Sequence, residues 1–128
     1  KTETNVIFGG TILYMAPENF NLDEDIDDES DVSYSLISTK TDVWAFGCIM
    51  SELFTGYRPW APLFEEDSKI TACLFKKVKF HFDSSKIEIF QIPELINECT
   101  NINPRDRLNM KEVKIKLIDI LYKKINKI

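Results

Sequence analysis

Histidine and cysteine, the side chains that most often bind zinc or act as nucleophiles, are few in this 128-residue sequence. One histidine, His81, stands between two phenylalanines, and three cysteines, Cys48, Cys73 and Cys99, lie far apart in apolar or helical patterns. None of these residues has the spacing of a zinc site. The sequence therefore predicts no metal centre. It predicts buried free thiols in a reducing compartment and a structural or surface role for His81.

The composition narrows the classes of partner. The chain is 44% hydrophobic and 29% charged, as in a soluble globular domain, and its net charge is −5. That charge disfavours nucleic acids and anionic membrane surfaces as partners. No apolar run reaches the roughly 18 residues of a membrane span, and no signal-peptide pattern opens the chain, so we expect a cytoplasmic protein. The first residue is not Met, which fits a piece of a longer protein.

An acidic run interrupts the first third of the chain. Seven of the nine residues from Asp23 to Asp31 are acidic. Such a stretch buries too little apolar surface to order itself. We interpret it as a solvated, mobile insert, and the alternative is a site for a basic partner.

The clearest predicted element is a helix over about residues 40–55. Thr39 and Asp42 have the spacing of a capping pair at its start, and Gly56 provides a stop. Apolar residues cover nearly its whole circumference. A helix of that kind must be buried on all sides, so we expect it to be the hub of the domain.

Three shorter amphipathic helices are predicted over residues 67–77, 92–100 and 110–124. The first should turn Ile70, Leu74 and Phe75 inward. The last should bury Val113, Leu117, Ile120 and Leu121. No strand alternation is evident. The predicted fold is mostly α, around a central buried helix and without a sheet.

Four separated motifs then coincide in order and approximate spacing. They are GTILYMAPE at residues 10–18, DVWAFG at 42–47, GYRPW at 56–60 and NPRDRL at 103–108. Together they resemble the eukaryotic protein kinase family, serine/threonine type, from the end of the activation segment onward. The resemblance implies a C-terminal kinase lobe over 1–128. Within it, residues 1–18 end the activation segment, 19–38 form the acidic insert and 39–128 form the helical core.

The family resemblance assigns structural roles to three residues. Glu18 and Arg107 match the partners of a buried ion pair that ties the activation segment to the lobe, which suits the planar guanidinium. Asp42 matches a carboxylate that holds the backbone of the catalytic loop, although helix capping alone would also explain it. Leu108 departs from the proline that often follows the late arginine, so the subfamily stays open.

The same resemblance places a protein substrate along the first motif. Thr11 matches a hydroxyl near the reacting groups of serine/threonine kinases, and the neighbouring residues Ile12, Leu13 and Tyr14 would shape a substrate pocket. Glu52 lies where some kinases bind a substrate arginine, and an ordinary helix-end carboxylate is the alternative. Thr2 and Thr4 are candidate activating phosphosites.

The ATP-binding and catalytic motifs of kinases are not in this sequence. It contains no Gly-rich phosphate loop and no HRD or DFG triplet. We therefore expect no catalytic residue, metal or cofactor here, and an inactive chain in isolation. The resemblance implies ATP and Mg²⁺ for the parent kinase, and the missing N-terminal part of its domain as a partner.

Two alternatives to an active parent kinase stay open. The parent could be a pseudokinase, or the chain could be a helical interaction module without catalysis. Apolar surface left exposed on the hub helix would favour self-association.

Overall fold

The computed structural model describes residues 12–20 and 30–126, and within these ranges it contains helices and loops but no strand. The α-helices are α2 (Ser30–Thr55), α3 (Asp67–Phe75), α4 (Gln91–Cys99) and α5 (Met110–Asn126). Short 3-10 turns are η1 (Ile12–Tyr14), η2 (Pro17–Phe20), η3 (Ser84–Lys86) and η4 (Pro104–Asp106). The predicted mostly helical fold is confirmed.

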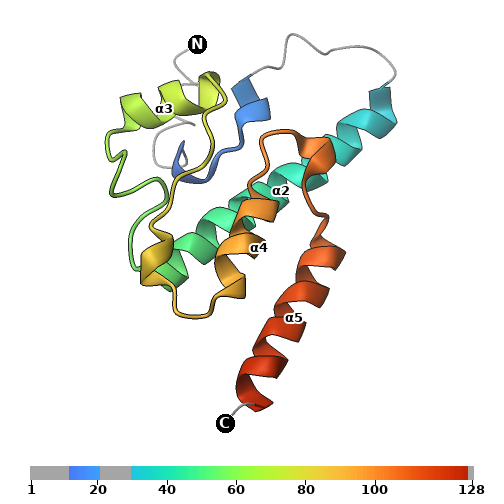
Figure 1. Cartoon of the computed structure of the whole chain (residues 1–128). Coiled ribbons are helices and arrows are strands. Elements are labelled where there is room, and N and C mark those ends of the chain that lie inside the picture. The colour runs from blue at the N-terminus through green and yellow to red at the C-terminus, as the bar shows by residue number, and fades with distance from the viewer. Residues whose placement is uncertain (1–11, 21–29, 127–128) are drawn as a thin grey trace.

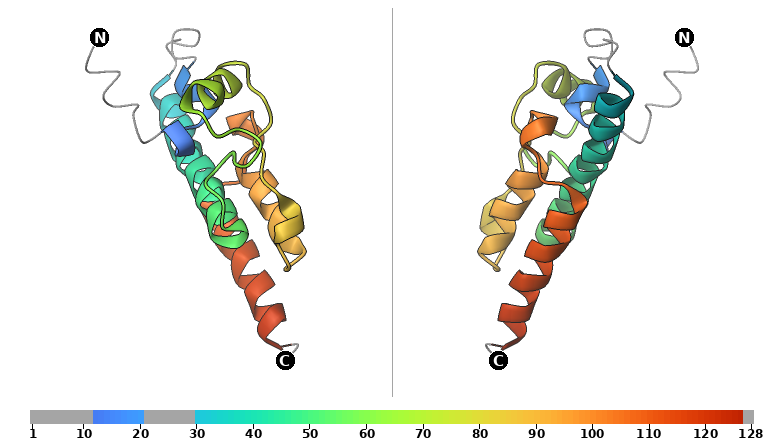
Figure 2. Two further views of the ribbon diagram at one scale, coloured as in Figure 1. Left: turned by 90° about the vertical axis from the view of Figure 1, so that its left-hand side faces the viewer. Right: turned by 90° about the vertical axis from the view of Figure 1, so that its right-hand side faces the viewer.

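Helix α2 is the central element, and α4, α5, η1, η3 and η4 pack on it (Figure 1). Helix α4 packs along α2, and α5 contacts both of these helices. The turns η1 and η2 contact α3, and η1 also contacts α2. The two side views show α5 extending past α4, with its outward side uncovered by the other described helices (Figure 2).

Helix α2 begins ten residues earlier than the sequence predicted. Thr39 and Asp42 lie inside it, so they do not cap its start. No Gly or Pro occurs between residues 30 and 39 to stop a helix, so it continues upstream of the capping signal. Residues 30–38, which the sequence analysis placed in the acidic insert, therefore belong to α2. The rest of the run, residues 23–29, lies outside the described residues.

Most of the apolar side of α2 is buried, but one strip is not. Trp44 is fully buried in an aromatic cluster with Trp60 and Phe80, whose rings meet edge to face at centroid distances of 5.1 to 5.9 Å. By contrast, Ile49 is 43% and Leu53 is 75% exposed. The prediction of burial on all sides is wrong for this strip, because no described residue covers it.

Close packing of α2 on α4 depends on a glycine. A β-carbon added at Gly47 would lie 2.8 Å from Cβ of Cys99 and 2.9 Å from Cγ2 of Thr100. Those atoms are fixed close to the α4 backbone and cannot swing aside. The missing side chain at position 47 therefore sets how closely the two helices approach.

The three shorter helices lie close to their predicted positions. At the start of α5, the backbone N–H of Asn109 donates to Glu112 Oε1 (2.9 Å) and that of Glu112 donates to Asn109 Oδ1 (2.8 Å), which forms a reciprocal capping box. Two side chains expected inside are exposed: Phe75 on α3 and Leu121 on α5. The core side of α5 consists of Val113, Leu117 and Ile120.

Candidate functional site

The structure brings Glu18 and Arg107 together in a buried ion pair. Arg107 Nη1 donates to Glu18 Oε2 at 2.8 Å, and Nη2 donates to Oε1 at 3.0 Å. The Arg107 side chain is 0% exposed and that of Glu18 is 13% exposed. Two parallel charge-assisted bonds of this kind fix both the distance and the orientation of the partners.

Every N–H of the Arg107 guanidinium has an acceptor. Nε donates to the carbonyl of Asn101 (2.8 Å), Nη1 also donates to that of Lys40 (2.9 Å), and Nη2 also donates to that of Ile102 (3.3 Å). The guanidinium lies over the ring of Trp44, 5.2 Å from its centroid. The cation is thereby compensated although water is excluded from it.

Two residues that the sequence analysis did not single out complete this cluster. Thr41 Oγ1 donates to Glu18 Oε2 at 2.6 Å. The buried Lys40 Nζ donates to the carbonyls of Arg107 (2.7 Å) and Pro104 (3.1 Å). The middle of α2 and the η4 region are therefore held together by bonds in both directions.

A second attachment joins the first described segment to the C-terminal end of α2. The Tyr14 hydroxyl donates to Glu52 Oε1 at 2.5 Å. This hydrogen bond, together with partial burial, raises the pKa of Tyr14 to about 12. Because the phenol must keep its proton to donate this bond, the bond favours the neutral phenol, and the pair stays intact at neutral pH.

The two attachments fix residues 12–20 antiparallel to α2, as Figure 1 shows for the blue segment. Tyr14 bonds residue 52, and Glu18 bonds residue 41. Eleven helical residues span about 16 Å, and four residues span at most about 14 Å even when fully extended, so side-chain length makes up the difference. The segment is held at both ends on one rigid support.

The remaining predicted site residues fall into three groups. Ile12 is buried in the core, so its side chain packs residues 12–20 against the helices. Leu13 is half-buried. Asp42 is exposed and makes no hydrogen bond or ion pair with a described residue. The predicted positions Thr2, Thr4 and Thr11 lie outside the described residues.

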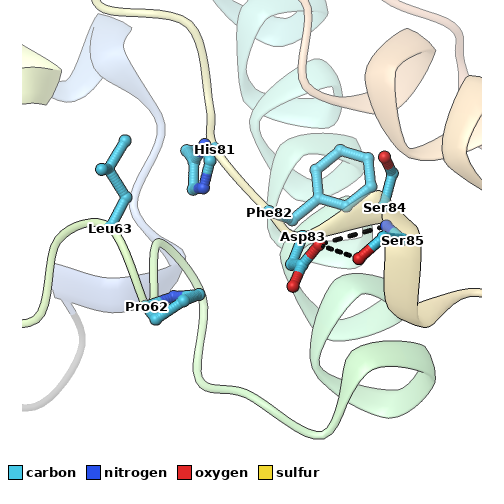
Figure 3. A pocket seen from close by; sticks show the side chains of 7 residues that line it. All are labelled: Pro62, Leu63, His81, Phe82, Asp83, Ser84 and Ser85. Carbon is cyan, nitrogen blue, oxygen red and sulfur yellow. Dashed lines mark hydrogen bonds between the residues drawn. The ribbon is translucent and has the colours of Figure 1, made fainter.

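A separate pocket of about 510 Å³ lies between the loop after α2 and the loop before η3 (Figure 3). Its lining residues are Pro62, Leu63, His81, Phe82, Asp83, Ser84 and Ser85. Asp83 Oδ1 accepts bonds from the backbone N–H (3.1 Å) and hydroxyl (2.6 Å) of Ser85, and the hydroxyl bond lowers the pKa of Asp83. That carboxylate therefore caps η3, and the pocket shares no residue with the two attachments.

The thiols and carboxylates of the described residues make no metal site. Cys48, Cys73 and Cys99 are free and buried, as predicted, and burial raises the pKa of each thiol. Among the residues with described positions, no group of three or more His, Cys, Asp or Glu side chains could hold a metal ion.

No helix in the described ranges has the length and apolar character needed to cross a lipid bilayer.

Comparison with known proteins places these features in one family. A family model described as protein kinase domain matches residues 1–116. The serine/threonine-protein kinase BCK1/SLK1/SSP31 of Saccharomyces cerevisiae is 29% identical over 118 residues, and the receptor protein-tyrosine kinase CEPR1 of Arabidopsis thaliana is 30% identical over 131. Mitogen-activated protein kinase kinase 1 of Arabidopsis thaliana is 29% identical over 112. These matches cover 88%, 93% and 83% of this chain, but 7%, 12% and 28% of those proteins.

Proposed function

We propose that this chain, which belongs to the protein kinase domain family, forms the peptide-substrate platform and helical scaffold of a protein serine/threonine kinase. One observation carries the proposal: residues 12–20 are fixed on the helical core at two points. Glu18 pairs with Arg107 and accepts a bond from Thr41 of α2, and Tyr14 donates to Glu52 of α2. A peptide-binding surface requires a segment held rigidly in this way, because positioning supplies much of the catalysis in phosphoryl transfer.

In this proposal the chemistry of phosphate transfer belongs to residues outside the described ranges. ATP would supply the transferred phosphoryl group and Mg²⁺ would neutralise its charge. The exposed carboxylate of Asp42 would anchor the backbone of the catalytic loop. The exposed strip of Ile49 and Leu53 would pack against the N-terminal part of the kinase domain.

The choice of serine or threonine as substrate rests on the first motif. Thr11 in the GTILYMAPE sequence favours hydroxyls of serine and threonine over tyrosine. The names of the relatives span serine/threonine, tyrosine and dual-specificity kinases, so substrate selection needs a direct test. Candidate phosphosites at Thr2 and Thr4 belong to the same proposal.

The proposal is tested with a protein that contains this chain together with the upstream part of its kinase domain. We expect phosphate transfer from ATP to serine or threonine peptides and little transfer to matched tyrosine peptides. Glu52→Gln keeps the acceptor for Tyr14 but removes the charge, so KM should rise for arginine-containing peptides with kcat nearly unchanged. Glu88→Gln, at an exposed position, is the control.

The competing function is a pseudokinase or interaction module without catalysis. It is favoured if the HRD and DFG triplets upstream are degraded and no phosphate is transferred, and intact triplets would remove the pseudokinase alternative. A separate calorimetric titration of MgATP into the 128-residue chain should show no saturable heat, and a micromolar site would refute the assignment of ATP binding to other residues.

The proposal also includes a cytoplasmic location and self-association of the isolated chain. Three buried free thiols support a reducing compartment. The exposed Ile49–Leu53 strip supports association of the isolated chain. Size-exclusion chromatography with light scattering should then show mass above the 14.9 kDa monomer, reduced by Leu53→Ser.

A further inference from the structure

Thr41 bonds the same carboxylate as Arg107, but from a different element of the fold. The Thr41 hydroxyl donates to Glu18 Oε2 at 2.6 Å, and Arg107 Nη1 donates to that oxygen at 2.8 Å. Thr41 belongs to α2, whereas Arg107 directly follows turn η4. The carboxylate of Glu18 is therefore held from two parts of the described structure.

The helical core holds Arg107 in place independently of Glu18. The guanidinium donates to the carbonyls of Asn101, Lys40 and Ile102, at 2.8 to 3.3 Å. The backbone of Arg107 is held as well, because Lys40 Nζ donates to its carbonyl at 2.7 Å. These bonds place the guanidinium before any contribution from residues 12–20, so Arg107 and Thr41 together form a preorganised acceptor site for the Glu18 carboxylate.

The two bonds from Arg107 leave Glu18 one soft motion. They come from a single planar group, so they fix the distance and direction of the carboxylate but permit a tilt about the line through its two oxygens. Such a tilt turns the lone pairs of Oε2 away from the Thr41 hydroxyl, and a hydrogen bond weakens when its donor leaves the plane of the acceptor group. Thr41 thus adds a restraint from α2 to the motion that the guanidinium leaves.

The other attachment of the segment does not replace this restraint. Tyr14 is joined to Glu52 by one hydrogen bond, and residues 12–20 can turn about a single bond. The orientation of the segment on α2 therefore depends on how firmly the carboxylate of Glu18 is held.

We propose that Thr41 is a positioning residue, whose hydroxyl sets the orientation of residues 12–20 on α2 by restraining Glu18. The consequence for peptide binding rests on the proposed function, whereas the consequence for the segment does not. Serine should replace threonine here because it keeps the donor. Valine should not, because it keeps the shape of threonine but has no hydroxyl.

The first test measures hydrogen exchange of single backbone amides in the 128-residue chain. The amide of Met15 donates to the carbonyl of Ile12 at 3.3 Å, and that of Asn19 donates to the carbonyl of Ala16 at 3.1 Å. Both amides report how often the segment opens. Thr41→Val should accelerate their exchange about fivefold, and Thr41→Ser should stay within about twofold of the unsubstituted chain.

Two control variants separate positioning from a general loss of stability. Thr71→Val repeats the chemical change at a hydroxyl that donates to the carbonyl of Asp67 inside α3, at 2.8 Å. Ile120→Val removes one methyl group from the core side of α5 and so lowers the stability of the whole chain. Neither control should change the exchange of Met15 and Asn19 by more than about twofold, because neither contacts Glu18.

The second test uses a protein that contains this chain together with the upstream part of its kinase domain. Thr41→Val should raise KM for a peptide substrate about threefold or more and leave KM for ATP within about twofold, and Thr41→Ser should restore the peptide KM. A purely structural role would instead lower the amount of active protein and leave both KM values unchanged.

The two tests fail in different ways. Unchanged exchange in Thr41→Val, equal acceleration in Ile120→Val, or no recovery in Thr41→Ser would overturn the positioning role. Accelerated exchange with an unchanged peptide KM would overturn its link to peptide binding. If the unsubstituted protein transfers no phosphate, the proposed function fails, and the exchange measurements still decide the role of Thr41.

Discussion

Substituting Glu18 by alanine tests whether the buried ion pair holds the first segment on the helical core. Glu18→Ala leaves the Arg107 guanidinium with its three carbonyl acceptors but without the carboxylate that compensates its charge. Removing one partner of a buried pair typically costs 3–5 kcal/mol of unfolding free energy. Because Glu18 itself is 13% exposed, water can enter in its place, and we expect a loss of about 3 kcal/mol.

The expected loss of unfolding free energy corresponds to a decrease in melting temperature, which depends on chain length through the unfolding entropy. At roughly 2.1 cal/mol/K per residue, 128 residues give an unfolding entropy of about 0.27 kcal/mol/K. A loss of about 3 kcal/mol then lowers Tm by about 11 °C. Urea unfolding followed by tryptophan fluorescence is a suitable assay, because Trp44 lies under the guanidinium and should respond directly.

An exposed ion pair provides the matched control. Glu98→Ala removes the partner of Lys116, whose side chain is 47% exposed, and should cost less than about 1 kcal/mol. Thr41→Ala removes one hydrogen bond to Glu18 and should cost about 1 kcal/mol. If Glu18→Ala and Glu98→Ala have the same effect within error, the buried pair does not stabilise the fold and the reasoning fails.

Three further predictions concern packing and titration. Gly47→Ala should destabilise the chain by about 1–3 kcal/mol because its β-carbon would meet Cys99, although the same change in an open helix is stabilising; an unchanged urea midpoint would contradict this. At pH 8, Cys73 should react with a thiol reagent before Cys48 and Cys99, whose pKa values burial raises further, and equal rates in the folded chain would show that the core is open. Because the folded-state pKa of Tyr14 is about 12 against an ordinary 10.0, the stability lost in Tyr14→Phe should be constant below pH 10. It should shrink as pH rises from 10 toward 12, whereas a pH-independent difference in urea unfolding would refute the bond to Glu52 as its source.

Local patterns predicted the positions of the short helices well. The turn signals around residues 67, 92 and 110 lie within a residue or two of the observed starts, because capping and breaking residues act on their immediate neighbours. The start of α2 was missed because the Thr39–Asp42 pattern is permitted inside a helix as well as at its end.

The long-range contacts of the site were only partly predictable. The family resemblance predicted Glu18 and Arg107 as partners, but it named Tyr14 and Glu52 only separately. No local pattern indicated that these two bond to each other across 38 residues. Lys40 was missed because lysine is rarely buried and its partners are backbone carbonyls, which the sequence does not mark. One signal was present: Lys40 is on the same helical side as the buried Val43 and Trp44.

Because residues 12–20 are attached to α2 at two points, the spacing of those points along the helix constrains the length of the segment. The two anchor points stand a fixed number of helical residues apart, so the connection between Tyr14 and Glu18 has a minimum length. Deleting a residue there would shorten its reach by up to about 3.5 Å and strain one of the two bonds, whereas an added residue would have to bulge outward for both to form. Chain length at this place is therefore constrained by geometry even where the side chains between the anchors are free to change.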